Sequence, residues 1–175
     1  MTKDMVAHAL LALMEEYPYQ KITISDIAKK AEVDRSTYYR NFHSKEDIIE
    51  YFFDRILQEF LDSFSDFSSI DYTIYFYSIF SIFYAYKKEV LLIYKTSLAS
   101  CLLEALSKRF RFSQYSEEAP VPKQYEISYI IGGIYNCLML WMARDMEETP
   151  EQMSEIALRF RNEDSLMLLN LHHSA

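Results

Sequence analysis

The chain has 175 residues, half of them hydrophobic and 16% aromatic, which is enough to bury a core and excludes a disordered chain. Its two glycines and four prolines are too few for the turns of a strand-rich fold, so we expect an all-α protein of about nine helices. Two distant cysteines exclude a disulfide framework, and acidic residues near the start exclude a signal peptide or membrane span, so we expect a cytoplasmic protein without membrane contact.

Charge is spread unevenly along the chain. The net charge of −8 argues against nucleic-acid binding by the whole surface. Residues 21–45 nevertheless hold six bases and three acids, a local charge of +3, so the remaining residues sum to −11. We therefore expect a basic patch on an acidic body.

Helical patterns with clear start signals follow one another over the first 63 residues. Thr23 with Asp26, and Ser44 with Asp47, have the spacing of capping boxes in which Asp takes the usual place of Glu. The predicted helices cover residues 3–16, 23–31, 35–41 and 44–63.

The second and third predicted helices have the dimensions of a helix-turn-helix. The turn "EVD" joins them, and Asp34 is a good N-cap for the third helix. Helices this short are unstable alone, so the first and fourth must cover their apolar faces. We assign residues 1–48 to this domain, with a small core of Leu10, Met14, Ile22, Ile27, Ala28, Val33, Tyr38, Phe42 and Ile48.

The third helix divides into an inner and an outer face. With 100° between successive residues, Tyr38 and Phe42 share one side. Arginine reaches the O6/N7 edge of guanine and hydroxyls suit phosphates, so the outer face suits DNA; a solvated polar helix is the alternative. Lys45, in the first turn of the next helix, is placed to meet a phosphate. The outward and flanking residues are Arg35, Ser36, Thr37, Tyr39 and Arg40.

A serine- and aspartate-rich segment at 65–71 is the best boundary before the body, and we assign residues 49–175 to a regulatory domain. The aromatic run that follows is apolar nearly all round, which is typical of a helix buried on several sides. The further helices are expected at residues 90–110, 123–146 and 150–169, the last with Thr149 as N-cap and Pro150 at its first position.

Aromatic residues of the body are candidates for an effector pocket, because rings with a few hydroxyls suit a small hydrophobic or aromatic ligand. The alternative is that these residues are simply core. The candidate pocket residues are Tyr72, Tyr75, Phe76, Phe80, Phe83, Tyr94, Cys101, Tyr129, Gly133 and Asn136.

The expected helix at 123–146 contains both glycines of the chain, Gly132 and Gly133. Glycine inside a helix costs about 1 kcal/mol, so we expect a packing reason: tight packing within the chain, room for a ligand, or close approach of a partner. An apolar face of this helix, together with the last helix, gives a candidate dimer interface of Ile134, Leu138, Trp141, Met153, Ile156 and Phe160.

Two stretches resemble regions of the TetR/AcrR family of transcriptional regulators. The DNA-binding region at the N-terminus of that family is similar to "ITISDIAKKAEVDRSTYYRNFHSKEDIIEYFF". The C-terminal dimerisation region of one branch of the family is more loosely similar to "YIIGGIYNCLMLWMARDMEETPEQM". The resemblance implies an all-helical homodimer that binds double-stranded operator DNA. The family usually has glycine where this chain has Glu32, and a left-handed glutamate there costs about 1 kcal/mol. The implied DNA contacts are Arg35, Ser36, Thr37, Tyr39 and Arg40, with Lys45 on phosphate and Ser25 and Lys29 near the backbone.

The expected function is that of a repressor that a small hydrophobic or aromatic effector releases from a pseudo-palindromic operator. The alternative is a helix-turn-helix coactivator or adaptor whose body binds a protein partner. We expect no enzyme, no cofactor and no metal site, because the sequence holds no nucleophile–base pairing or P-loop. The adjacent His172 and His173 do not face the same way on a helix.

Overall fold

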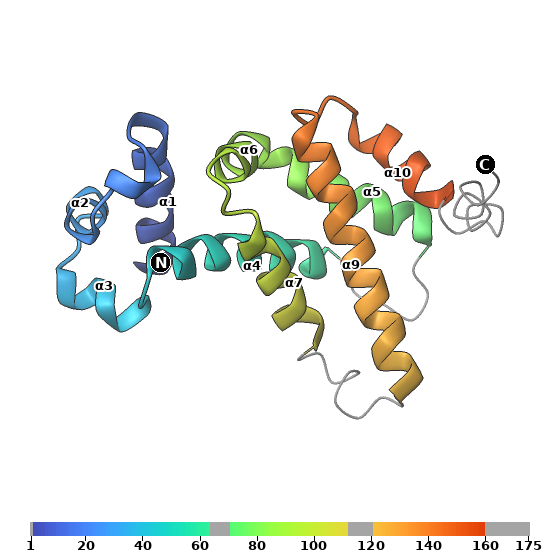
Figure 1. Cartoon of the computed structure of the whole chain (residues 1–175), viewed down its shortest axis with the longest axis horizontal. Coiled ribbons are helices and arrows are strands. Elements are labelled where there is room, and N and C mark those ends of the chain that lie inside the picture. The colour runs from blue at the N-terminus through green and yellow to red at the C-terminus, as the bar shows by residue number, and fades with distance from the viewer. Residues whose placement is uncertain (1, 64–70, 112–120, 160–175) are drawn as a thin grey trace, which may run out of the picture.

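The computed structural model describes residues 2–63, 71–111 and 121–159. Every regular element in these ranges is a helix, so the predicted all-α fold is confirmed (Figure 1). The elements are α1 (Thr2–Glu16), the 3-10 helix η1 (Tyr19–Lys21), α2 (Ile24–Lys30), α3 (Arg35–Asn41), α4 (Lys45–Asp62), α5 (Tyr72–Ala85), α6 (Lys87–Lys95), α7 (Ser100–Arg111), α9 (Val121–Ala143) and α10 (Pro150–Arg159).

Both predicted capping boxes are present, at the starts of α2 and α4. Thr23 Oγ1 accepts the N–H of Asp26 at 3.2 Å, and the Asp26 carboxylate accepts the N–H of Thr23 at 2.9 Å. Ser44 Oγ accepts the N–H of Asp47 at 3.0 Å, and the Asp47 carboxylate accepts the N–H groups of Ser44 and His43. These bonds satisfy donors that have no partner within a helix, and so fix where each helix begins.

Helices α1, α2 and α3 enclose an apolar core that the start of α4 closes. Eight of the nine predicted core residues are buried, and Val33 is half-buried. A fully buried side chain of this size contributes about 1.5–3 kcal/mol. Burial of the shared core therefore stabilises two seven-residue helices that are too short to persist alone.

Helix α4 joins the N-terminal domain to the body, where it packs on α5 and α7 (Figure 1). One cluster of buried residues runs from Val6 in α1 to Ala157 in α10. The boundary that we expect at residue 48 therefore lies inside a helix that both parts share.

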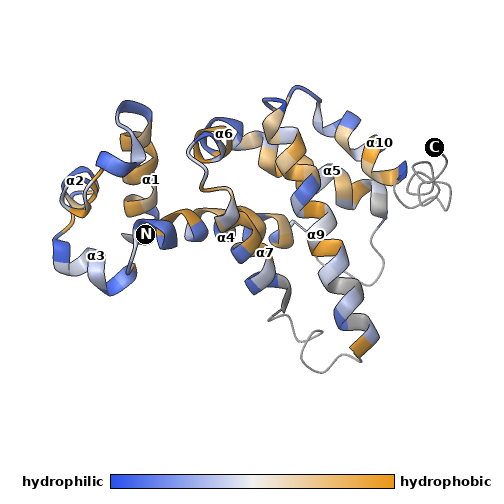
Figure 2. Cartoon of the chain, in the orientation of Figure 1, coloured by the Kyte–Doolittle hydropathy of each residue, from blue (hydrophilic) through white to orange (hydrophobic). Residues whose placement is uncertain are grey.

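In the body, α5 packs along α10, and α7 packs on α4 and α9. One prediction is wrong here. The helix expected at 90–110 breaks into α6 and α7, with Ser97 between them at a φ of 62°. Helix α5 packs against α4, α6 and α10, with Phe83 fully buried, although Ile74 is 58% exposed. Figure 2 shows the apolar residues gathered along α4, α5 and parts of α9, whereas α3 is mostly hydrophilic.

Candidate nucleic-acid interface

Helix α3 lies at the end of the molecule opposite the body (Figure 1). Asp34 occupies the N-cap position with an extended backbone, but its side chain makes no capping bond, unlike Thr23 and Ser44. The helix ends where the backbone of Phe42 turns extended and its ring enters the core. Its seven residues are thus held by packing more than by capping.

The two faces of α3 are oriented as the helical spacing predicts. Tyr38 is 0% exposed and Phe42 is 3% exposed, so both anchor the helix in the core. Tyr39 is 46% exposed, and its ring meets the Tyr38 ring edge-on with centroids 5.3 Å apart. Arg35, Ser36 and Arg40 are exposed and Thr37 is half-exposed.

A hydrogen bond within the outer face orients its C-terminal arginine. Arg40 Nη2 donates to Thr37 Oγ1 at 2.9 Å, one helical turn away. Asn41 Nδ2 donates to the Thr37 carbonyl at 2.7 Å and ties the same turn. The bond to Thr37 Oγ1 restricts the Arg40 guanidinium to fewer positions on the outer face.

The Tyr38 hydroxyl is buried, and none of the described groups is its hydrogen-bond partner. Burial raises the pKa of Tyr38 to about 12, and the nearby Asp47 carboxylate adds to the shift. The ring thus stays neutral and serves as an apolar anchor beneath the outer face.

Glu32 adopts a left-handed backbone with a φ of 55°. The turn closes through the N–H of Val33, which donates to the Ala28 carbonyl at 3.0 Å, and the N–H of Glu32, which donates to Lys29. This pattern is the usual end of a helix whose next residue is left-handed, a position that favours glycine. A glutamate thus occupies the left-handed position at which the resemblance led us to expect a glycine.

The structure shows the Lys45 ammonium in contacts within the chain, and the phosphate contact expected for it stays a prediction. Its ammonium donates to the carbonyls of Tyr19 at 2.7 Å and Ile22 at 3.0 Å, and it lies 4.0 Å from the centroid of the Tyr19 ring. The Tyr19 hydroxyl in turn donates to Glu46 at 2.7 Å. These contacts, which we call the α4 clasp, engage the ammonium of the half-exposed Lys45 and join η1 to the start of α4.

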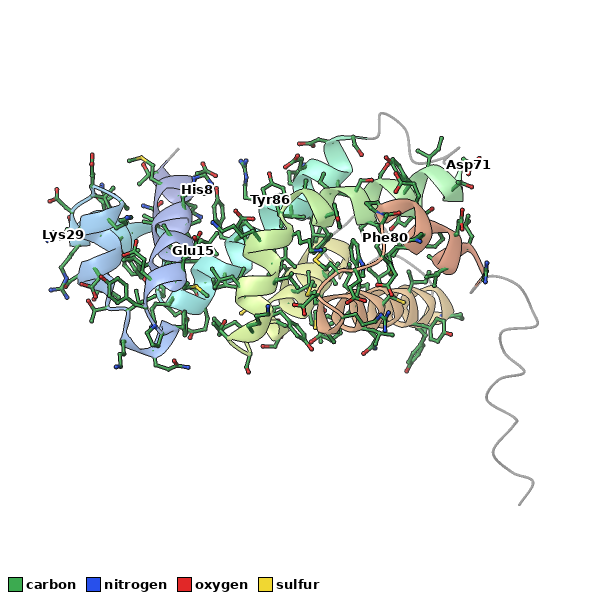
Figure 3. The ribbon with its side chains drawn as sticks, turned by 90° about the horizontal axis from the view of Figure 1, so that it is seen from above. His8, Glu15, Lys29, Asp71, Phe80 and Tyr86 are labelled. Carbon is green, nitrogen blue, oxygen red and sulfur yellow. The ribbon has the colours of Figure 1, made fainter. Side chains whose placement is uncertain are left out.

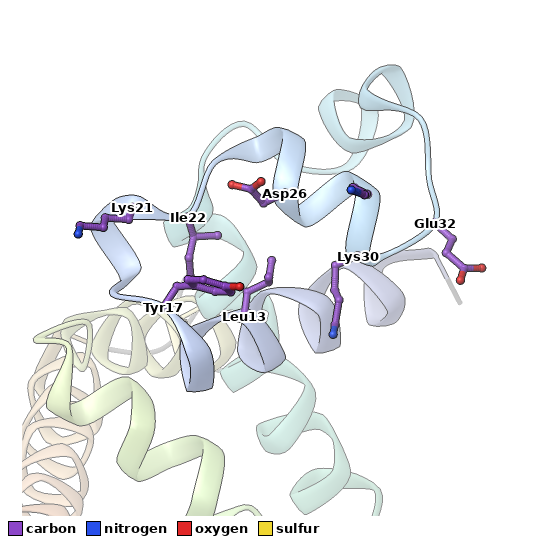
Figure 4. A pocket seen from close by; sticks show the side chains of 8 residues that line it. Leu13, Tyr17, Lys21, Ile22, Asp26, Lys30 and Glu32 are labelled. Atoms are coloured by element: carbon purple, nitrogen blue, oxygen red, sulfur yellow. The ribbon is translucent and has the colours of Figure 1, made fainter.

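Ser25 and Lys29 are both exposed on α2. Lys29 also lines a cleft of about 530 Å³ between α1 and α2 (Figure 4). Leu13, Tyr17 and Ile22 make the apolar side of this cleft. Both lysines and carboxylates line this cleft, so the cleft presents no single sign of charge.

The candidate effector pocket is not assembled as we expected. Phe80, which Figure 3 labels, is buried in the core of the body. Phe83 is buried there too, and Phe80 meets Trp141 edge-on with centroids 5.5 Å apart. Tyr129 is 78% exposed, and the Asn136 amide donates to the Gly132 carbonyl on the outside of α9.

The remaining pocket candidates are spread over several elements. Cys101 is buried, Tyr75, Phe76 and Tyr94 are half-buried, Gly133 is exposed, and the side chain of Tyr72 lies outside the described residues. Two clefts, of about 530 and 430 Å³, are lined by none of the candidate pocket residues. The second cleft lies where α1, α3, α4 and α7 meet.

The face of α9 predicted for the dimer interface is the face that packs into its own body. Leu138 and Trp141 are at most 1% exposed, and Trp141 Nε1 donates to the Glu148 carbonyl at 3.1 Å. Met153 is 7% exposed, whereas Ile134 is half-buried and Ile156 is 36% exposed. Phe160 lies outside the described residues. Burial within one chain leaves Leu138, Trp141 and Met153 no surface for a partner.

Sequence reasoning missed the α4 clasp because 26 residues separate Tyr19 from Lys45, and no local pattern connects them.

In the described ranges, no cluster of three or more His, Cys, Asp or Glu is arranged to hold a metal ion. No single helix among those described is long and apolar enough to cross a membrane, although the bent pair Lys87–Lys95 and Ser100–Arg109 passes that test together by length and composition.

Two regions of the chain each match a known protein family. Residues 7–52 match the family described as bacterial regulatory proteins, tetR family, and residues 71–163 match that described as transcriptional regulator C-terminal region. Over 66 residues, or 38% of this chain, the sequence is 30% identical to the HTH-type dhaKLM operon transcriptional activator DhaS of Lactococcus lactis subsp. lactis (strain IL1403). The match spans 35% of the length of that relative.

Proposed function

Because the chain belongs to the TetR family of bacterial regulatory proteins, and is therefore a DNA-binding transcriptional regulator and not an enzyme, we propose that the outer face of α3 reads its operator. The observation that carries this proposal is the fixed division of α3. Tyr38 is buried beneath it, while Tyr39 and the Thr37-bound Arg40 project away from the protein.

The chemistry of the outer face suits a major groove. Arg35 and Arg40 are donors for guanine edges or phosphates, and the hydroxyls of Ser36 and Tyr39 suit phosphates or base edges. Ser25 and Lys29 on α2 complete the proposed contact surface. Lys45 is left out of this surface, because the α4 clasp holds its ammonium.

A single short recognition helix reads about one half-site, and its few phosphate contacts bind weakly at physiological salt. Two copies related by a two-fold axis and reading a pseudo-palindrome double the contacts. We therefore propose that the operator-bound form is a homodimer.

For the mode of regulation, we propose two candidates: release of a repressor by a small effector, and action as a coactivator or adaptor through a protein contact. The packing of the body supports the second, because Phe80 and Phe83, two of the aromatic candidates for an effector pocket, fill the core. The relative DhaS is named as an activator.

Selection of bound sequences from a random DNA pool tests operator reading. We expect enrichment of two inverted half-sites, and binding to the selected DNA that falls at least about tenfold between 50 and 200 mM salt. A pool without enrichment, or an affinity indifferent to salt, would refute the proposal.

A further inference from the structure

We propose that Thr37 positions Arg40 to read one guanine in each half-site of the operator. Thr37 is then a positioning residue, which acts on DNA through the arginine, and Arg40 makes the base contact. This assignment rests on the proposed function, in which the outer face of α3 binds DNA.

The Arg40 side chain reaches back toward the start of its own helix. Its Nη2 donates to Thr37 Oγ1 at 2.9 Å. Thr37 is the third residue of α3 and Arg40 the sixth, so the bond holds the guanidinium about 4.5 Å nearer the N-terminus than the Arg40 backbone. In helix-turn-helix proteins the N-terminal residues of the recognition helix contact the base edges. The bond therefore brings the positive charge of Arg40 to the half of α3 that meets the bases.

Ser36, Thr37 and Arg40 form one strip of the outer face. Arg40 follows Ser36 by four residues and Thr37 by three, the spacings that bring helical side chains together. Ser36 and Arg40 are exposed and Thr37 is half-exposed. In the part of the chain that the structure describes, Thr37 is the hydrogen-bond partner of Arg40 and no carboxylate forms an ion pair with it. The charge of Arg40 is therefore held in place without being neutralised.

The donors that Thr37 and Arg40 present match guanine. One N–H group of the guanidinium goes to Thr37, and the others stay free. The Thr37 hydroxyl accepts in this bond and keeps its own hydrogen for donation. Guanine shows two acceptors, O6 and N7, in the major groove, whereas adenine shows a donor beside its acceptor and cytosine shows a donor. A strip of donors therefore favours guanine over the other bases.

Arg35 differs from Arg40 because no neighbour holds it. Its side chain forms no hydrogen bond or ion pair within the described ranges. It is the first residue of α3 and lies about 140° around the helix from Arg40. Phosphate contacts fix the protein on the duplex but carry no sequence information, so they do not require an oriented side chain. We assign Arg35 to phosphate, and it serves as the matched control for Arg40.

Thr37→Val removes the hydroxyl that accepts the Arg40 bond and replaces it with a methyl group of similar size. Asn41 Nδ2 donates to the main-chain carbonyl of Thr37 at 2.7 Å, so that bond stays. We therefore expect the variant to melt within a few degrees of the wild type. Thr37→Ser keeps the hydroxyl and should behave like the wild type. Arg40→Lys keeps the charge but loses the planar fork, and it tests the same pair without changing Thr37.

Affinities for a set of operator variants measure the effect. The operator selected from the random pool is compared with versions in which each guanine in turn is exchanged for adenine in both half-sites. At one guanine the wild type and Thr37→Ser should bind the exchanged operator at least about tenfold more weakly. In Thr37→Val and Arg40→Lys this penalty should fall below about threefold, with the penalties at other positions unchanged. Arg35→Lys should leave every penalty as in the wild type.

Three results would overturn the assignment. One is a guanine penalty that Thr37→Val leaves intact, and another is a guanine penalty that Arg40→Lys leaves intact. The third is an equal loss of affinity by Thr37→Val for all operators, which would make Thr37 a direct phosphate contact. Each of these results leaves operator reading by α3 standing, because the selected half-sites are still bound. A random pool without enrichment would instead refute operator reading, and the role of Thr37 with it.

Discussion

Glu32 holds a left-handed backbone that glycine adopts without steric cost. Replacing Glu32 with Gly should raise the free energy of unfolding by about 0.5–1 kcal/mol, the left-handed cost less the entropy that glycine loses on folding. Urea denaturation measures the change. Glu32→Ala keeps a Cβ and should gain little, so an equal gain in both variants would show that the turn is not strained.

Individual side chains of α3 were predictable, because their orientation depends only on helical spacing. Tyr38 and Tyr39 are neighbours in sequence, yet the spacing alone places one inside and the other outside, as the structure has them. The bond between Thr37 and Arg40 follows from the same spacing but depends on a rotamer that no sequence pattern gives.

The start of α4 is held by contacts to η1, and its stability should depend on Lys45. Replacing Lys45 with Met leaves the carbonyls of Tyr19 and Ile22 without their ammonium donor. We expect the free energy of unfolding to fall by about 1–3 kcal/mol, measured by urea denaturation. Lys30→Met, at an exposed position on α2, is the control. If Lys45→Met left the free energy of unfolding unchanged but weakened DNA binding, Lys45 would instead be assigned to a phosphate contact.

Asp47 makes the start of α4 sensitive to acid. Burial by itself raises the pKa of Asp47, but bonds from Ser44 Oγ and from the N–H groups of His43 and Ser44 outweigh it and lower the pKa below 3.8. A carboxylate whose pKa is lowered on folding stabilises the folded protein above about pH 4. This contribution is lost as the pH falls through the folded-state pKa.

Replacing Asp47 with Asn should therefore destabilise the protein more at pH 7 than at pH 3, as measured by urea denaturation at both values. Glu155→Gln, an exposed carboxylate of α10, is the control. A loss of stability for Asp47→Asn that is the same at both values would contradict the role assigned to the carboxylate.

Helix α9 shows where sequence reasoning fails at the scale of an element. It is apolar on two opposite sides, so periodicity does not say which side enters the core. The side of Leu138 and Trp141 packs inside, and the side of Tyr125 and Tyr129 faces outward. Aromatic composition likewise left a pocket and a solid core around Phe80 as alternatives, because only packing decides whether rings enclose a space or fill it.

At the scale of the whole molecule, the acidic charge and the basic patch have separate places. Residues 21–45 concentrate positive charge on α2, α3 and their flanks, at the end of the chain farthest from the body (Figure 1). The fold class was predictable from caps and turn formers. The pairing of helices in the body was not, because it depends on contacts between distant segments.

The affinity of Arg40→Ala and Tyr39→Ala for the selected operator tests the central claim, that the outer face of α3 reads DNA. Both side chains are exposed, and only Tyr39 touches the core, through the Tyr38 ring, so both variants should melt within a few degrees of the wild type. We expect each to bind at least about tenfold more weakly, as for the loss of a base contact. Arg159→Ala, an exposed arginine of α10, should bind like the wild type. Unchanged operator affinity in both α3 variants would contradict the assignment.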